Sequence, residues 1–102
     1  MSTGRTKKLA PIHPGDVLHE VLLGAGMSAN ALALALRVPA NRIGGILKGQ
    51  RGITADTALR LACYFGTSAQ LWMNLQAKYD LASAEDALRP RIQREVPPRS
   101  AA

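Results

Sequence analysis

Apolar residues recur at spacings of three and four along most of this chain, which is the period of an amphipathic α-helix. Alternating runs of Val, Ile and Thr, which would indicate β-strands, do not occur in it. We therefore expect an all-α protein. The first helix begins at Pro14 and stops at Gly24–Gly26, and its apolar face is formed by Val17, Leu18, Val21 and Leu22.

The segment from Met27 to Arg51 predicts two short helices joined by a tight turn. Ser28 is a good N-cap, so the first of them can begin at the next residue. Pro39 disfavours helical geometry at the residue before it, and this helix must therefore stop near Arg37. The second helix has a buried face made of Ile43, Ile46 and Leu47. Such a pair has the layout of a helix-turn-helix, which sets its second helix in the DNA major groove.

Two more helices follow, which makes five in all. The fourth begins after Thr54, a suitable N-cap, and ends at Gly66. The fifth is capped by Thr67 or Ser68 and runs to about Leu81. Its apolar stripe is unusually large and consists of Leu71, Trp72, Leu75 and Tyr79.

Both ends of the chain differ in composition from the middle. Residues 1–11 are polar and basic, which predicts a flexible arm. The stretch from Arg89 onwards contains three prolines and few apolar residues. We expect one compact domain over residues 12–82 and a C-terminal extension, residues 83–102, that is largely disordered.

The distribution of charge indicates what kind of partner the helix-turn-helix binds. The chain has a net charge of +6 and a pI near 10.3, and four cations but no acid lie between residues 37 and 51. Lys and Arg displace counterions from phosphates, so this segment favours nucleic acid as a partner. A solvated cationic face is the simpler alternative, and a basic composition alone also suits ribosomal or membrane-surface proteins.

Residues for other chemistry are sparse. Cys63 is the only cysteine, which excludes an internal disulfide and fits a reducing compartment. His13 and His19 are six residues apart across a helix start and make a poor metal pair. Paired carboxylates, zinc-type spacings and phosphate-cradling loops do not occur, so we expect neither an enzyme nor a cofactor. No apolar run has the length of a signal peptide or a membrane span, which predicts a cytoplasmic protein.

The segments IHPGDVL, NALALALRVPANRI, RGITADTALRLA and YFGTSAQLWMNLQ make the chain resemble the HigA-type antitoxins, within the lambda-repressor-like helix-turn-helix class. The resemblance covers roughly residues 12–82. It implies a compact five-helix DNA-binding domain and a homodimer that represses its own promoter by binding operator DNA. It also implies a partner, a HigB-like toxin that is a RelE-like, ribosome-dependent mRNA endonuclease.

The resemblance also assigns roles to residues. Base edges would be read from the start of the third helix and one turn on, by Ala40, Asn41, Arg42 and Gly45. Phosphates would be met by Ser28 and Asn30 at the start of the second helix, and by Lys48, Gln50 and Arg51 after the third. The sequence departs from the family pattern at Ala29, where Gln is frequent, and at Arg37, where a left-handed turn residue is usually Gly.

Two alternatives stay open at this point. Trp72, Leu75 and Tyr79 form either part of the core or the dimer interface, because large aromatic residues serve both purposes. The function itself has rivals in a stand-alone helix-turn-helix repressor and in a toxin-binding module with a weakened DNA-reading helix. The second rival is suggested by Ala29, Ala40 and the adjacent Gly44 and Gly45, since each Gly weakens a helix by roughly 1 kcal/mol relative to Ala.

Overall fold

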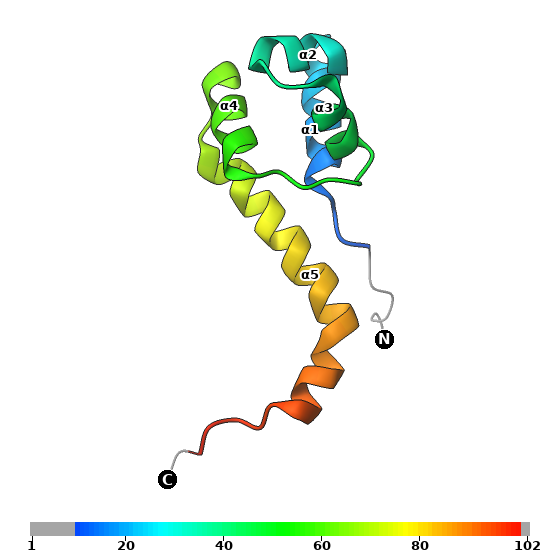
Figure 1. Cartoon of the computed structure of the whole chain (residues 1–102), viewed down its shortest axis with the longest axis vertical. Helices are drawn as coiled ribbons and strands as arrows, with labels where there is room; N and C mark the ends of the chain where they lie inside the picture. Colours follow the sequence, from blue (N-terminus) through cyan, green and yellow to red (C-terminus); the bar gives the residue numbers. More distant parts are fainter. Residues whose placement is uncertain (1–9, 101–102) are drawn as a thin grey trace, which may run out of the picture.

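The computed structural model describes residues 10–100, so most of the expected basic arm, residues 1–9, lies outside the described residues. Within that range the chain forms five α-helices and no strand, which confirms the predicted all-α fold. In Figure 1 helices α1 to α4 gather at one end of the molecule and α5 runs away from them. The helices are α1 (Pro14–Ala25), α2 (Ala29–Leu36), α3 (Ala40–Leu47), α4 (Ala55–Phe65) and α5 (Ala69–Glu95).

Local capping sets most helix ends. The Ser28 hydroxyl accepts a hydrogen bond from the Ala31 amide at 3.1 Å, and Thr54 caps α4 in the same way, as predicted. Ser68 is the cap of α5, while the Thr67 hydroxyl accepts instead from the indole N–H of Trp72 at 3.1 Å.

The start of α1 is capped by a residue that the sequence did not suggest. His13 Nδ1 accepts from the Gly15 amide at 2.8 Å, and the His13 amide donates to the Asp16 carboxylate at 3.3 Å. The two bonds form a reciprocal capping box with His in place of Ser or Thr.

One apolar core joins the five helices. Its largest member is Trp72, which is 1% exposed. Trp72 is therefore part of the core, which for this residue decides between the core and the dimer interface. The other core residues are Leu18, Leu22, Leu32, Ala33, Leu36, Ile43, Ile46, Ile53, Ala58 and Leu61.

Helix α3 is seated on α1 through a close backbone contact. A Cβ on Gly15 would overlap the carbonyl oxygen of Ile46 and lie 2.9 Å from its carbonyl carbon. Gly15 is thus the residue that lets the first turn of α1 reach the backbone of α3. The position of α3 in the domain depends on this contact.

The expectation that the fifth helix ends near Leu81 is wrong, because α5 continues to Glu95. Pro90 removes one backbone donor, but the surrounding Ala, Leu, Glu and Arg residues are strong helix formers. Ion pairs one turn apart, Glu85 with Arg89 and Arg91 with Glu95, support the same segment. The extension is therefore helical from residue 83 to Glu95 rather than largely disordered, although every residue from 84 to 100 is exposed.

No single helix among residues 10–100 is long and apolar enough to cross a membrane. Helices α1 and α2 would be so only together, as a pair bent by 97°. Their apolar residues Leu18, Leu22 and Leu32 are buried in the core.

Candidate nucleic-acid interface

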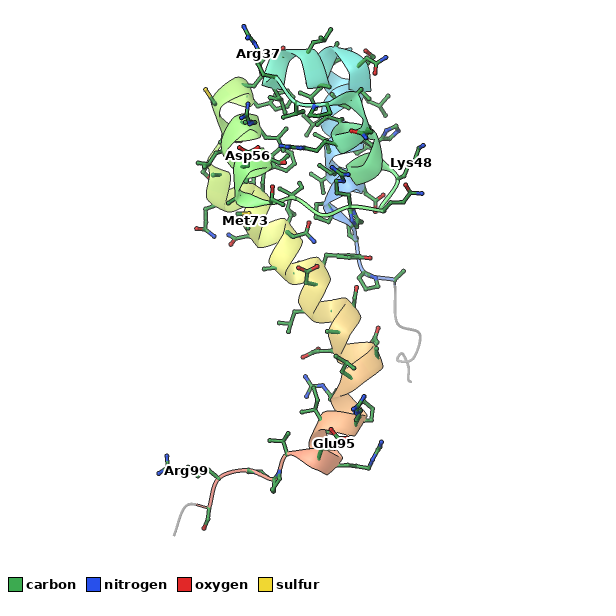
Figure 2. The ribbon with its side chains drawn as sticks, viewed as in Figure 1. Arg37, Lys48, Asp56, Met73, Glu95 and Arg99 are labelled. Carbon is green, nitrogen blue, oxygen red and sulfur yellow. The ribbon has the colours of Figure 1, made fainter. Side chains whose placement is uncertain are left out.

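The turn between α2 and α3 directs the second of these helices outwards. Arg37 adopts a left-handed conformation, with φ 60° and ψ 45°, and is the one residue other than glycine with a positive φ in the described part of the chain. The Val38 amide then donates to the Ala33 carbonyl at 3.0 Å, which closes the turn. The turn thus has the geometry that normally favours Gly, and Arg37 tolerates it with its side chain directed into solvent (Figure 2).

Helix α3 presents a polar face opposite its buried face. Ile43 and Ile46 are fully buried, whereas Ala40 and Asn41 are exposed. The N-cap, Pro39, makes no side-chain hydrogen bond to the first turn of the helix. The residues predicted to read base edges are therefore at the surface, apart from Arg42 and Gly45, which are half-buried.

Arg42 is held by a partner on α4. Its Nη1 atom donates to Oδ2 of Asp56 at 2.6 Å, and the same oxygen accepts from Nε of Arg60 at 3.0 Å. Arg60 also donates through Nη1 to the carbonyl oxygen of Leu36 at 2.8 Å. The hydrogen bond from Arg42, followed by that from Arg60, keeps the pKa of the Asp56 carboxyl below its usual value of 3.8.

Asp56 is not among the site residues predicted from the sequence. The pair Asp56 and Arg60, four residues apart on one helix, was visible in the sequence. The pair Arg42 and Asp56 was not, because 14 residues separate its members and only the packing of α3 against α4 joins them.

The loop after α3 carries the predicted phosphate contacts. Lys48, Gln50 and Arg51 are all exposed, and Figure 2 shows Lys48 directed away from the helices. Arg51 lies alongside α3, since a Cβ on Gly45 would be 3.3 Å from the Arg51 Cβ and 3.5 Å from its Nε. Gly45 thus makes room for a guanidinium beside the helix rather than offering its own backbone alone.

The other predicted phosphate contacts lie at the start of α2. Ser28 and Asn30 are exposed, although the Ser28 hydroxyl is already used as the helix cap. Ala29, between them, is half-buried against the core.

The residues predicted for a dimer interface are divided by the structure. Trp72 is buried, and Leu75 and Tyr79 are half-buried. The ring of Tyr79 meets the ring of His13 edge to face, with centroids 4.7 Å apart, so it also covers the start of α1. More exposed apolar side chains lie further along α5, where Leu81, Leu88 and Ile92 are 64%, 42% and 48% exposed.

Comparison with known proteins agrees with this arrangement. Residues 18–72 match the helix-turn-helix family. Virulence-associated protein I of Dichelobacter nodosus is 56% identical over 79 residues, which are 76% of this chain and 73% of the relative. The structure of Pseudomonas aeruginosa antitoxin HigA with the higBA promoter is 49% identical, with a TM-score of 0.85, and the match covers 88% of this chain and 99% of that one. The chain belongs to the HigA-type antitoxins.

A second antitoxin structure extends the match along the chain. Antitoxin GraA in complex with its operator is 37% identical, with a TM-score of 0.85, over 96% of this chain and 100% of that one. The resemblance inferred from the sequence motifs is confirmed, and so is the helix-turn-helix fold. These relatives are DNA-binding regulators and antitoxins rather than enzymes.

Proposed function

We propose that this HigA-type protein is the antitoxin of a toxin and antitoxin pair. As a homodimer it binds operator DNA at its own promoter and represses transcription, and it neutralises a HigB-like toxin of the RelE-like mRNA endonuclease type. Its place of action is the cytoplasm, where the operator and the ribosome are.

The observation that carries the DNA-binding part is the surface of α3 and the loop after it. This surface combines an exposed first helical turn with four cations and no acid between residues 37 and 51. Two antitoxin structures of similar fold, those of HigA and GraA, were solved with promoter or operator DNA, which supports DNA binding by this chain.

The chemistry of the side chains assigns their roles. Asn41 can bond bidentately to adenine and Arg42 to guanine, and each such pair contributes roughly 1–3 kcal/mol of discrimination. Ala40 offers a methyl contact to thymine. Contacts to phosphates fix the register without reading sequence, and they fall to Ser28, Asn30, Lys48, Gln50 and Arg51, with Gly45 accommodating the last of these.

Paired substitutions test this assignment. Arg42→Ala should weaken binding to the protein's own operator more than binding to a scrambled duplex, because base contacts discriminate and phosphate contacts do not. Arg51→Ala should weaken both by a similar factor. Fluorescence anisotropy titrations at one salt concentration measure all four affinities, and equal losses on both duplexes for Arg42→Ala would remove Arg42 from the base-reading set.

A dimer requires an apolar surface that is not already buried in the core of the monomer. The C-terminal half of α5 has one, in a groove lined by Leu81, Ala84, Leu88 and Ile92 with Glu85 and Arg89 beside it. Two such helices packed antiparallel about residue 87 would set Glu85 of one chain opposite Arg89 of its partner, which gives a self-complementary contact. We therefore propose that the dimer interface extends from Leu75 and Tyr79 into this segment.

Neutralisation of the toxin is expected to use another surface. Asn41→Ala combined with Arg42→Ala should abolish promoter repression but leave rescue from the co-expressed toxin intact. Asn41 is exposed and Arg42 points away from the buried Ile43 face, so the double variant should stay folded. A promoter-reporter assay and a growth assay in one strain separate the outcomes. Loss of rescue by a folded variant would place the toxin on α3, and absence of any rescue by the wild type would favour a stand-alone repressor.

A further inference from the structure

An acidic residue lies among the cations of the proposed DNA-reading surface. Asp56 lies at the start of α4, projects towards α2 and α3 (Figure 2), and shares a cleft with Arg42, Arg51 and Arg60. Among residues 37–60 it is the only acid. A carboxylate facing DNA repels phosphates, so its presence there calls for a compensating role.

The hydrogen bonds around Asp56 form a brace that connects three helices. Arg60 links the carbonyl end of α2, at Leu36, to the carboxylate, and the carboxylate in turn holds Arg42 on α3. Both guanidinium groups converge on one oxygen atom, Oδ2. Because Arg60 is anchored through both Nε and Nη1, the carboxylate has a fixed place from which to orient Arg42.

The bond to Asp56 leaves the base-reading edge of Arg42 available. A guanidinium is planar and presents its donors as forks, one of them along the Nε and Nη2 edge. The guanidinium of Arg42 uses Nη1 for Asp56, and no other described residue accepts a hydrogen bond from this guanidinium. The Nε and Nη2 fork can therefore bond to O6 and N7 of a guanine while Nη1 stays on the carboxylate.

We propose that Asp56 is a positioning residue that sets operator specificity by holding Arg42 in its base-reading orientation. The proposal rests on the proposed DNA-binding function and names a further residue of that site. A tethered Arg42 has already lost its freedom of rotation before DNA arrives, which favours the one guanine that it can reach. The same tether denies the side chain to phosphates at other positions.

Charge and positioning make opposite predictions for two substitutions. Asp56→Asn removes the negative charge and weakens the tether, whereas Asp56→Glu keeps the charge and displaces the carboxylate by one methylene. If Asp56 positions Arg42, both variants should lower the ratio of operator affinity to scrambled-duplex affinity, and Asp56→Asn should do so about tenfold. If Asp56 acts through charge alone, Asp56→Asn should raise both affinities by the same factor and Asp56→Glu should leave both unchanged.

Fluorescence anisotropy with the full-length protein, the promoter operator and a scrambled duplex provides these ratios. Glu20→Gln is the matched control for loss of one negative charge, since Glu20 is exposed on α1 and joins no ion pair within the described residues. The same Asp56→Asn change in an Arg42→Ala background should leave the ratio where Arg42→Ala alone puts it, because the brace then has nothing to orient. An unchanged ratio in the Asp56 variants, or an equal fall of the ratio in the Arg42→Ala background, would overturn the proposal.

The ratio of the two affinities distinguishes a positioning role of Asp56 from a purely structural role and from a failure of the proposed function. A variant that is partly unfolded binds both duplexes more weakly and leaves the ratio of the two affinities unchanged. A purely structural role of Asp56 would therefore not change this ratio. A wild-type protein that fails to discriminate operator from scrambled DNA would overturn the proposed function itself, before any Asp56 variant is compared.

Discussion

Gly15→Ala is the most direct test of how α3 is held in place. The added methyl group would overlap the Ile46 carbonyl oxygen, lie 2.9 Å from the Ile46 carbonyl carbon and lie 3.0 Å from Nδ1 of His13. Two of these atoms belong to the backbone of α3, so no side-chain rotation can relieve the clash. Helices α1 and α3 must move apart, and the α1 cap is disturbed at the same time.

The magnitude follows from two opposing terms. Overpacking of this kind costs about 1–3 kcal/mol and occasionally more. Ala gains at most about 1 kcal/mol over Gly from helix propensity. Since the clash is with backbone, we expect a net loss of about 2 kcal/mol, which lowers the melting temperature of a domain of this size by roughly 10 °C.

The assay is thermal unfolding followed by circular dichroism, with Gly24→Ala as the matched control. Gly24 lies on the same helix, and a Cβ there would meet nothing within 4 Å. The control should melt at or above the wild-type temperature. Gly15→Ala should also bind operator more weakly, because α3 would no longer be seated. A Gly15→Ala protein that melts like Gly24→Ala would refute the reasoning about the α1 and α3 contact.

Three further predictions concern single residues. Arg37→Gly should stabilise the domain by about 0.5–1 kcal/mol by relieving the left-handed φ of 60°, as measured by the urea midpoint; a lower midpoint would contradict it. Because the folded-state pKa of Asp56 is lowered, its carboxylate stabilises the fold above the unfolded pKa, and this effect is lost as the pH falls through the folded-state pKa. The difference in melting temperature between wild type and Asp56→Asn at neutral pH should therefore shrink below pH 3.8 and vanish once the pH is below the folded-state pKa. A difference that persists there would point to another cause. Leu88→Glu should yield monomers in sedimentation while Leu23→Glu, at a 63% exposed site on α1, should not; a dimer mass unchanged by Leu88→Glu would move the interface elsewhere.

Local signals explain which parts of the fold could be predicted. Ser28, Thr54 and Gly66 each act within one helical turn, so their sequence context was sufficient to set the ends of α2 and α4. The prolines near the C-terminus do not predict the end of α5, because the helix-forming residues around Pro90 continue the helix to Glu95. Proline disfavours a helix interior strongly but not absolutely, and ion pairs on both sides of it offset part of the cost.

The site was predictable in composition but not in its internal contacts. Exposure of Asn41 follows from the position of the apolar residues on α3, and Lys48 and Arg51 are exposed in the loop after this helix. The brace from Leu36 through Arg60 to Asp56 depends on the angle at which α4 crosses the helix-turn-helix. That angle is a property of the packed core, and no spacing along the chain encodes it.

The 27-residue length of α5 also sets a distance within the proposed dimer. A helix of that length spans about 40 Å, and its outer half lies beyond the core that holds α1 to α4. In the proposed dimer the distance and phase between the two copies of α3 are fixed by the number of residues between Trp72 and the contact at Leu88. One inserted residue would rotate each copy of the α1 to α4 unit by about 100° relative to the dimer contact, so that α3 would no longer face the DNA major groove. Seven inserted residues would nearly restore this rotation and place each unit about 10 Å further out. The spacing between operator half-sites in such a family would then change in increments set by whole turns of α5.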